Sequence, residues 1–213
     1  MFAKAKEIIP LVVMFSLPGL FVITQTGGGG GFDFALWPYS FSLVLLIGSI
    51  FTPAWLDRVT SFCIPFHIGL CIPASILLSE QSLHINSSLM TAVGVCVLML
   101  SVIFFVWTNT LFLTEGGGSL SPASPPSRFV VSGPYQHVRN PMILAVILFQ
   151  LSLAFAVNES ARMLLFTAHF FVMNNIYFIF EEEPTLSKRF GSSYDKYKRH
   201  VGRWMPRISP YKE

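Results

Sequence analysis

The sequence carries little charge. Only 12% of its 213 residues are Asp, Glu, Lys or Arg, whereas 53% are hydrophobic. A soluble domain typically has about 25% charged residues, so this chain has about half the usual amount. A chain of this length with a mean hydropathy of +0.60 would leave much apolar surface in water. The composition therefore predicts an integral membrane protein rather than a soluble enzyme.

Cysteine is scarce and forms no recognisable pattern. Cys63, Cys71 and Cys96 lie in apolar runs with a spacing typical of neither a disulfide framework nor a zinc site. We expect buried free thiols. Two glycine-rich stretches lack the Gly-Lys-Ser/Thr sequence of a phosphate-binding loop. No catalytic triad or metal-ligand cluster stands out, so no metal site is predicted.

Long apolar runs are abundant. A membrane-spanning helix needs about 20 mostly apolar residues. The candidate spans are 8–25, 36–54, 61–79, 87–113, 141–157 and 161–180. The last two are separated by Asn-Glu-Ser alone and should form a tight hairpin. The predicted fold is all-α: a polytopic membrane helical bundle of about six spans, with five as the alternative, a C-terminal hairpin and an amphipathic cytosolic helix.

The positive charges predict the orientation in the membrane. With six spans, 13 of the 14 Lys and Arg residues fall on the side of both termini, and Arg162 falls on the other. Under the positive-inside rule that side is cytoplasmic. Topology and attraction to anionic lipids explain the basic tail, so no nucleic-acid partner is expected. We expect one domain, with spans in 1–113, a cytosolic loop in 114–140, and the hairpin and C-terminal segment in 141–213.

A polar motif, GPYQHVRNPMI at 133–143, lies directly before the fifth apolar run. Asn140 is a suitable N-cap and Pro141 suits a first helical turn. The free N–H groups and the positive end of the helix dipole should then face the cytoplasm beside Arg139. This favours a site for a carboxylate or phosphate. The alternative is that Arg139 reaches toward lipid headgroups.

A second polar group lies at the end of the sixth run. At 100° per residue, five polar side chains fall within about 160° of one another on a helix: Asn174, Asn175, Tyr177, Glu181 and Glu182. Such a stripe should face protein or a water-filled cavity. The carboxylates could bind an ammonium group or a ribose hydroxyl, or could pair with Lys188 and Arg189. The hairpin would bring the Arg139 and Glu182 ends together, where a zwitterionic small molecule would fit.

The segment after Pro184 should contain two short helices. Gly191 is expected to end the first, while Ser192 and Asp195 resemble a capping box for the second. Tyr194, Tyr197 and Val201 form an aromatic stripe opposite basic residues. This pattern predicts an amphipathic helix on the membrane surface that could roof the cavity.

These two motifs resemble those of the isoprenylcysteine carboxyl methyltransferase and phospholipid methyltransferase superfamily of membrane enzymes. The first is GPYQHVRNPMI. The positions of the second motif are Glu182, Glu183, Leu186, Phe190, Gly191, Tyr194, Tyr197, Val201, Arg203 and Pro206. The resemblance covers roughly residues 128–209.

The resemblance implies a membrane methyltransferase that uses S-adenosylmethionine. The cofactor would lie between the last hairpin and the C-terminal segment, open to the cytosol. A lipophilic acceptor, prenylcysteine carboxylate-like or a lipid headgroup, would enter from the bilayer. The implied cofactor-binding residues are Tyr135, His137, Asn140, Pro141, Glu182, Glu183 and Arg203. Arg139 and Glu182 would serve catalysis, with Arg139 orienting a carboxylate of the acceptor or the cofactor.

Two positions depart from the superfamily pattern. Ile143 stands where Tyr is common, and Ala145 stands where Gly is common. Either change would fit a different acceptor or weaker catalysis. The competing hypotheses are a membrane NADPH-dependent sterol or steroid reductase-like enzyme and a non-catalytic homologue. A carboxylate acceptor needs no general base, whereas an amine would need deprotonation by a glutamate or water. His67 and His169, within spans, are expected to be packed residues.

Overall fold

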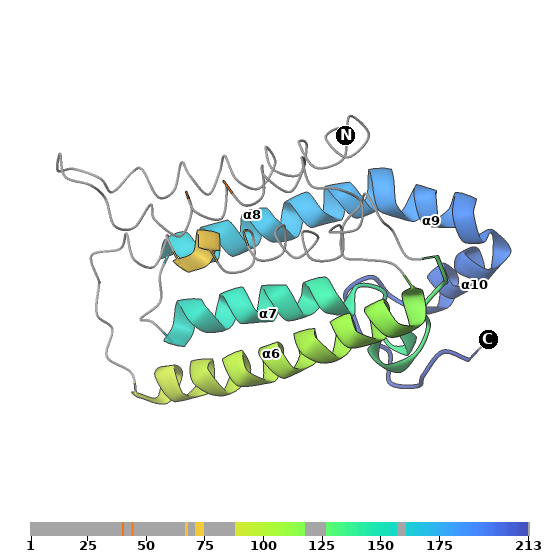
Figure 1. The fold of residues 1–213 in the computed structure, drawn as a ribbon. Coiled ribbons are helices and arrows are strands. Elements are labelled where there is room, and N and C mark those ends of the chain that lie inside the picture. Colours follow the sequence, from red (N-terminus) through yellow and green to blue (C-terminus); the bar gives the residue numbers. More distant parts are fainter. Residues whose placement is uncertain are drawn as a thin grey trace.

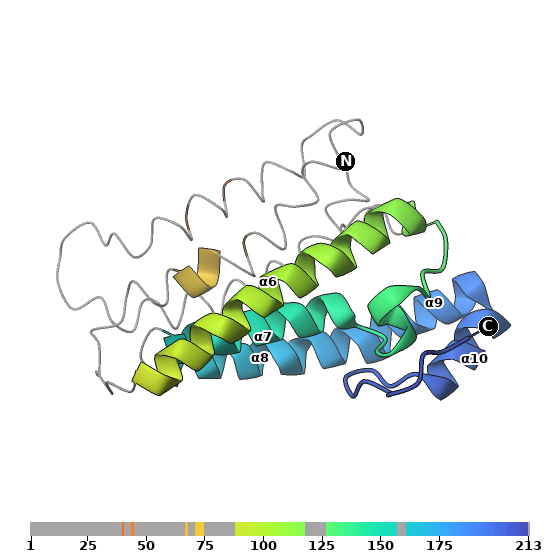
Figure 2. The same ribbon diagram turned by 90° about the horizontal axis from the view of Figure 1, so that it is seen from below.

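The computed structural model describes residues 88–117, 127–156 and 161–212, together with Ser40, Val44, His67 and 71–74. Every regular element within those three ranges is helical, in agreement with the predicted all-α class. Three long helices lie side by side, and the short helices and the C-terminal segment gather at one end of them (Figures 1 and 2). The predicted spans 8–25, 36–54 and 61–79 fall almost entirely outside the described residues.

Helix α6, Ser88–Gly116, corresponds to the predicted span 87–113 and ends three residues later. It is long and apolar enough to cross a membrane, as is the continuous helical stretch Met163–Phe190. Leu89, Leu100 and Ile103 on α6 are each more than 60% exposed. Cys71 is buried as expected, but Cys96 on α6 is exposed, so that prediction was wrong; Cys63 lies outside the described residues. An apolar helix with an exposed apolar surface suits a lipid environment better than water.

Helices α7, Pro141–Ala156, and α8, Ala161–Tyr177, follow in the chain. Helix α7 begins at Pro141, as predicted, and the Asn140 carbonyl accepts a hydrogen bond from the Leu144 amide at 3.0 Å. It runs antiparallel to both α6 and α8 (Figure 1). At Gly94 a Cβ would lie 2.7 Å from the backbone nitrogen of Ala156. The missing side chain therefore lets the α6 and α7 backbones approach closely.

Helix α8 continues through one π-helical turn, Phe178–Glu182 (η4), into α9, Glu183–Phe190. The Glu183 amide donates to the Phe178 carbonyl five residues back. This wider turn shifts the register, so the 100° wheel no longer applies beyond Tyr177. Asn174 is buried as the predicted stripe requires, whereas Glu181 is exposed. The stripe is therefore broken at its acidic end.

Helix α10, Ser192–His200, follows Gly191, which ends α9 with a φ of 57° as predicted. The predicted capping box was wrong. Because Ser192 is already the first helical residue, Gly191 occupies the N-cap and no side chain caps the helix. The Asp195 carboxylate instead accepts a hydrogen bond from the Ser187 hydroxyl at 2.9 Å, which links α9 to α10.

The aromatic stripe of α10 faces protein. Tyr194, Tyr197 and Val201 are at most 3% exposed and form a core with Tyr211. The Phe129 ring meets the Tyr197 ring at 5.1 Å between centroids. The prediction that this stripe rests on the membrane surface was therefore wrong, because residues 127–131 and the C-terminal segment supply aromatic partners. The core fixes α10 against the loop that carries the first motif.

Candidate functional site

The first motif begins in a short 3-10 helix, η3, Gly133–Gln136. Gly133 has a φ of 54°, and a Cβ there would lie 2.7 Å from Cδ1 of Leu111 on α6. The Tyr135 side chain is buried, and its ring stacks on Phe112 with 6.5 Å between centroids. The left-handed conformation and the close approach both favour glycine at 133. The motif is thus held against α6.

The C-terminal segment is bonded to the same motif. The Arg139 amide donates to the Gly202 carbonyl at 2.9 Å, and the Tyr197 hydroxyl donates to the Tyr135 carbonyl at 2.6 Å. Two further backbone bonds join Arg207 N to His137 O at 2.9 Å and Tyr211 N to Gln136 O at 3.0 Å. Residues 135–139 and 197–211 therefore form one unit, although some 60 positions of sequence separate them.

Glu183 is the centre of a buried ion-pair cluster. Its Oε1 accepts from Nη1 of Arg139 and from Nε of Arg203, both at 2.7 Å. Its Oε2 lies 2.7 Å from Nζ of Lys198. The Glu183 side chain is 6% exposed and that of Arg139 is 12% exposed. The fold thus joins the first motif, the acidic run and the C-terminal segment at one carboxylate.

This arrangement differs from the two sequence-based alternatives for the acidic run. Glu183 pairs with neither Lys188 nor Arg189, so the alternative of local pairing does not hold for this glutamate. Its carboxylate also presents no free oxygen to an ammonium group, because both oxygens already face cations. Arg139 points at Glu183, and its buried Nε has no hydrogen-bond partner within the described ranges. Glu183 accordingly positions Arg139 and Arg203.

Glu182 has a different environment. Its side chain is half-buried and makes no hydrogen bond or ion pair with any residue in 88–117, 127–156 or 161–212. The charge of Glu182 acts on Tyr135. Burial is the first cause that raises the pKa of Tyr135 above its ordinary value, and the Glu182 carboxylate is the second. The phenol therefore stays protonated at neutral pH. This leaves one available carboxylate beside one hydroxyl donor.

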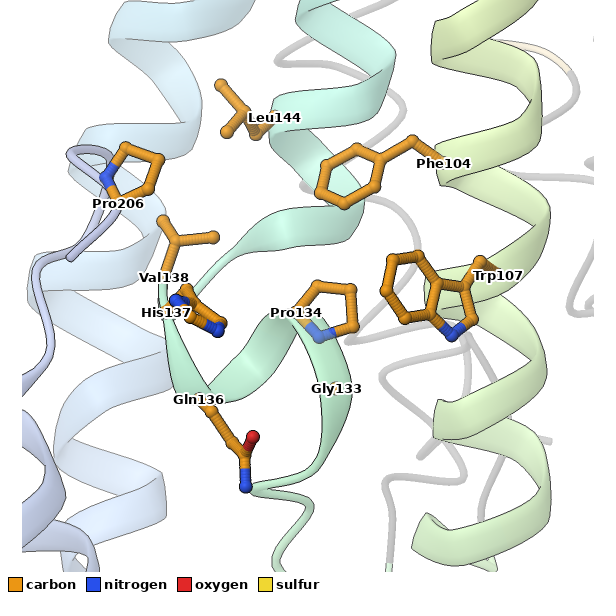
Figure 3. Close-up of a pocket in the computed structure, with 9 residues that line it drawn as sticks. All are labelled: Phe104, Trp107, Gly133, Pro134, Gln136, His137, Val138, Leu144 and Pro206. Carbon is orange, nitrogen blue, oxygen red and sulfur yellow. The ribbon is translucent and has the colours of Figure 1, made fainter. Parts of the chain in front are cut away.

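An open cavity of about 350 Å³ lies at the first motif. Its lining residues come from α6, the first motif, α7 and the C-terminal segment (Figure 3): Phe104, Trp107, Gly133, Pro134, Gln136, His137, Val138, Leu144 and Pro206. None of them is charged, and most are apolar. The volume is at the lower end of the roughly 300–1,000 Å³ of small-molecule sites.

Some of the predicted site residues lie in the ion-pair cluster or at the cavity, whereas Glu182, Asn140 and Pro141 belong to neither. His137 lines the cavity, and Tyr135 lies between two residues that line it. Arg139, Glu183 and Arg203 meet in the ion-pair cluster. Asn140 and Pro141 start α7 directly after Arg139. The start of α7, helix α9 and helix α10, which carry or adjoin these residues, lie at one end of the long helices (Figure 2).

Sequence reasoning missed Lys198 of the ion-pair cluster and three aromatic residues. Phe104 and Trp107 line the cavity from α6, and only their aromatic character within an aliphatic run could have suggested a role. Trp204 donates through Nε1 to Oδ1 of Asn175 at 2.7 Å and so ties the C-terminal segment to α8. An asparagine inside an apolar helix was the available signal, but its partner 29 residues away could not be inferred.

The arrangement defines a class of protein: a helical chain with apolar helices of membrane-spanning length and one polar site at their common end. Residues 89–193 match the model of the phospholipid methyltransferase family. The chain therefore carries a phospholipid methyltransferase family domain, which confirms the resemblance to that superfamily of membrane methyltransferases. The match includes Arg139, Glu182 and Glu183 but ends before Lys198 and Arg203. Comparisons with curated proteins and with solved structures gave no match.

Proposed function

We propose that the protein is an integral membrane methyltransferase that transfers a methyl group from S-adenosylmethionine to a lipophilic acceptor. The family domain supports methyl transfer, and two described helices of membrane-spanning length support a place in the bilayer. Under this proposal the chain forms about six spans with a C-terminal hairpin and both termini in the cytoplasm.

The observation that carries the proposal is the Glu182 carboxylate, which lies beside Tyr135 and has no hydrogen bond or ion pair among the residues that the structure describes. A half-buried, unpaired carboxylate is costly unless a ligand or water satisfies it. S-adenosylmethionine supplies, when bound, a methyl group already activated on a sulfonium sulfur. Glu182 would hold its ammonium group or ribose hydroxyls, and Tyr135 would donate a hydrogen bond. The residues present thus fit the cofactor at this point.

The remaining predicted residues have supporting roles. His137, Asn140 and Pro141 would complete the cofactor pocket from the loop. Arg139 and Arg203 would face it from the cluster, held in place by Glu183. Because methyl transfer needs mainly proximity and alignment, a rigid loop tied to the C-terminal segment suits the reaction.

The apolar cavity would take the lipophilic acceptor. Trp107 is 52% exposed and also lines the cavity, so the cavity adjoins the exposed apolar surface of α6. An acceptor dissolved in the bilayer could then reach the site from the side. This placement favours an acceptor with an apolar body next to its reacting group.

The test is ligand-dependent stability of the purified full chain. S-adenosylmethionine at about 100 times its Kd should stabilise the native state by about 2.7 kcal/mol and raise the unfolding midpoint. Labelled methyl groups should also pass into a membrane lipid extract. A higher unfolding midpoint with NADPH, and not with S-adenosylmethionine, would favour the reductase hypothesis. Protection by neither, with no label transferred, would overturn the proposal in favour of a non-catalytic homologue.

A further inference from the structure

We propose that Nε2 of His137 accepts a hydrogen from the reacting group of the acceptor, so that the acceptor is an N–H, O–H or S–H nucleophile rather than a carboxylate. The inference rests on the proposed function and narrows its substrate class. It follows from the hydrogen bonding of one ring and from the chemistry of the cavity that the ring lines.

The tautomer of His137 follows from its partner. Nδ1 lies 2.8 Å from the backbone carbonyl oxygen of Arg207. A carbonyl oxygen can only accept, so Nδ1 carries the hydrogen of this bond. In the neutral ring, Nε2 then has a lone pair and no hydrogen. The His137 carbonyl also accepts from the Arg207 amide at 2.9 Å, so the residue is held on two sides.

Nε2 is free to meet a ligand. It makes no hydrogen bond with any residue in the described ranges, and it is not among the buried polar atoms that lack a partner. His137 lines the cavity between Pro134 and Val138 (Figure 3). The cavity therefore offers an acceptor of hydrogen bonds on an otherwise largely apolar wall.

The rest of the lining disfavours an anionic acceptor. Among the described lining residues, Gln136, His137 and the indole N–H of Trp107 are the polar groups, and neither lysine nor arginine is present. The guanidinium of Arg139 is engaged by Glu183, and that of Arg207 donates to the His200 carbonyl and the Ser209 hydroxyl. Moving a carboxylate into such surroundings is costly without a paired cation. A neutral group that donates a hydrogen would meet a suitable partner at Nε2.

The proton transfer balances as follows. The bond between hydrogen and the reacting atom of the acceptor breaks, and its electron pair stays on that atom as the lone pair used in methylation. A new N–H bond forms at Nε2. His137 becomes an imidazolium whose Nδ1–H remains bonded to the Arg207 carbonyl, and it later gives the proton to water. Such a base typically accelerates a reaction by about 10²–10⁴.

The inference can be tested without measuring activity. The experiment measures the affinity of small probe molecules for the full chain in nanodiscs, with no methyl donor present. Three probes share one apolar body: 4-hexylphenol, 4-hexylanisole and 4-hexylbenzoate. The matched variants are His137→Asn, whose amide can still donate toward the Arg207 carbonyl, and His200→Asn. His200 is an exposed histidine on α10 with the same kind of contact, 2.7 Å from Nδ1 to the Lys196 carbonyl.

His137→Asn should weaken phenol binding about fivefold to tenfold, the worth of one neutral hydrogen bond, and leave anisole binding unchanged. His200→Asn should change neither, and the wild type should bind benzoate more weakly than phenol. Unchanged phenol binding in His137→Asn, or benzoate as the tightest probe, would overturn the inference. In wild-type protein with ¹⁵N-labelled histidine, phenol but not anisole should shift one Nε2 resonance; absence of that shift would also overturn it.

An alkylamine and its quaternary analogue form a second pair of probes. A comparison of this pair with the phenol and anisole pair distinguishes an amine acceptor from a hydroxyl acceptor. If S-adenosylmethionine protects the protein but His137→Asn binds phenol normally, the role of His137 fails and the proposed function stands. The opposite result is also possible: the tighter binding of 4-hexylphenol than of 4-hexylanisole depends on His137, but S-adenosylmethionine neither binds nor donates a methyl group. In that case the proposed function fails instead.

Discussion

Glu181, Glu182 and Glu183 are consecutive and chemically identical, yet their side chains have three environments. Glu181 is exposed, Glu182 is half-buried with no polar partner in the described part of the chain, and Glu183 is buried among cations. The π-helical turn that ends at Glu182 separates them, because it changes the direction of successive side chains. Each position can therefore be tested against its neighbours with the same Glu→Gln change.

Glu182→Gln should lower the affinity for S-adenosylmethionine about tenfold, since it replaces a charge-assisted hydrogen bond by a neutral one. The dependence of the unfolding midpoint on ligand concentration measures this affinity. Glu181→Gln is the control and should leave it unchanged. Equal effects of the two substitutions on the affinity would show that Glu182 does not bind the cofactor.

Glu183→Gln should lower stability by up to about 3 kcal/mol, because it removes the negative charge that three cations share in a largely buried place. Denaturant unfolding in detergent measures the loss, with Glu181→Gln again as control. A midpoint equal to that of the wild type would mean that the cluster does not hold the C-terminal segment.

Stability should fall as the pH rises above 10. Burial first, and then the Glu183 carboxylate, raise the pKa of Tyr194 from 10.0 to about 12. The unfolded chain therefore loses this proton before the native state does, and the native state is favoured fully only below pH 10. Unfolding midpoints at pH 9, 10 and 11 should decrease in that order, and Tyr194→Phe should reduce the slope. A flat profile, or an unchanged slope in Tyr194→Phe, would contradict this.

At the scale of elements, close contact of α6 with α7 places the first motif. The α6 helix supplies Phe104 and Trp107 to the cavity, and α7 begins where the motif ends. Their backbones approach at Gly94. A shift of α6 relative to α7 would therefore change the width of the cavity.

Gly94→Leu should lower stability by about 1–3 kcal/mol, because the new side chain has to push Ala156 away. The neighbouring residue Val93 is 54% exposed, so Val93→Leu serves as the matched control. The thermal midpoints of the two variants in the same detergent give the comparison. Similar midpoints would show that the close contact is not maintained in solution.

The described long helices were predictable because apolar runs of their length have few other stable forms. The start of α7 at Pro141 and the end of α9 at Gly191 followed from residues with restricted or unusual backbone preferences. The π turn was not predictable, since no residue type specifies it. The capping box failed because helix α10 starts one residue earlier than Ser192 at the cap would require.

The two motifs predicted Arg139, Glu183 and Arg203 as neighbours, but they predicted neither the pairings of these residues nor the fourth member of the ion-pair cluster, Lys198. Arg139 and the acidic run were expected at the same end, but which glutamate meets the guanidinium depends on the π turn. The buried face of α10 was misassigned because Tyr194 and Tyr197 suit a membrane surface and an aromatic core equally well. Their partners come from two other segments: Phe129 precedes the long helices α7 and α8, and Tyr211 lies in the irregular segment after α10.

For the whole molecule, the charge distribution predicts both termini in the cytoplasm. With six spans, 13 of 14 Lys and Arg residues lie on that side, together with the polar site. In sealed vesicles with the cytoplasmic face outward, protease should remove tags from both ends. Protection of the N-terminal tag alone would indicate five spans. Protection of both tags would indicate the opposite orientation, with both termini and the polar site on the non-cytoplasmic side.

The bonds between residues 135–139 and 197–211 have a consequence for the order of events during synthesis. The ribosome produces the apolar helices first, and residues 197–211 emerge after them. Until they do, Arg139 and Glu183 lack Arg203, and the loop lacks its backbone partners. A nascent chain stopped before that point would have its long helices but an incomplete site, so under the proposed function the helices would enter the membrane before the site could act.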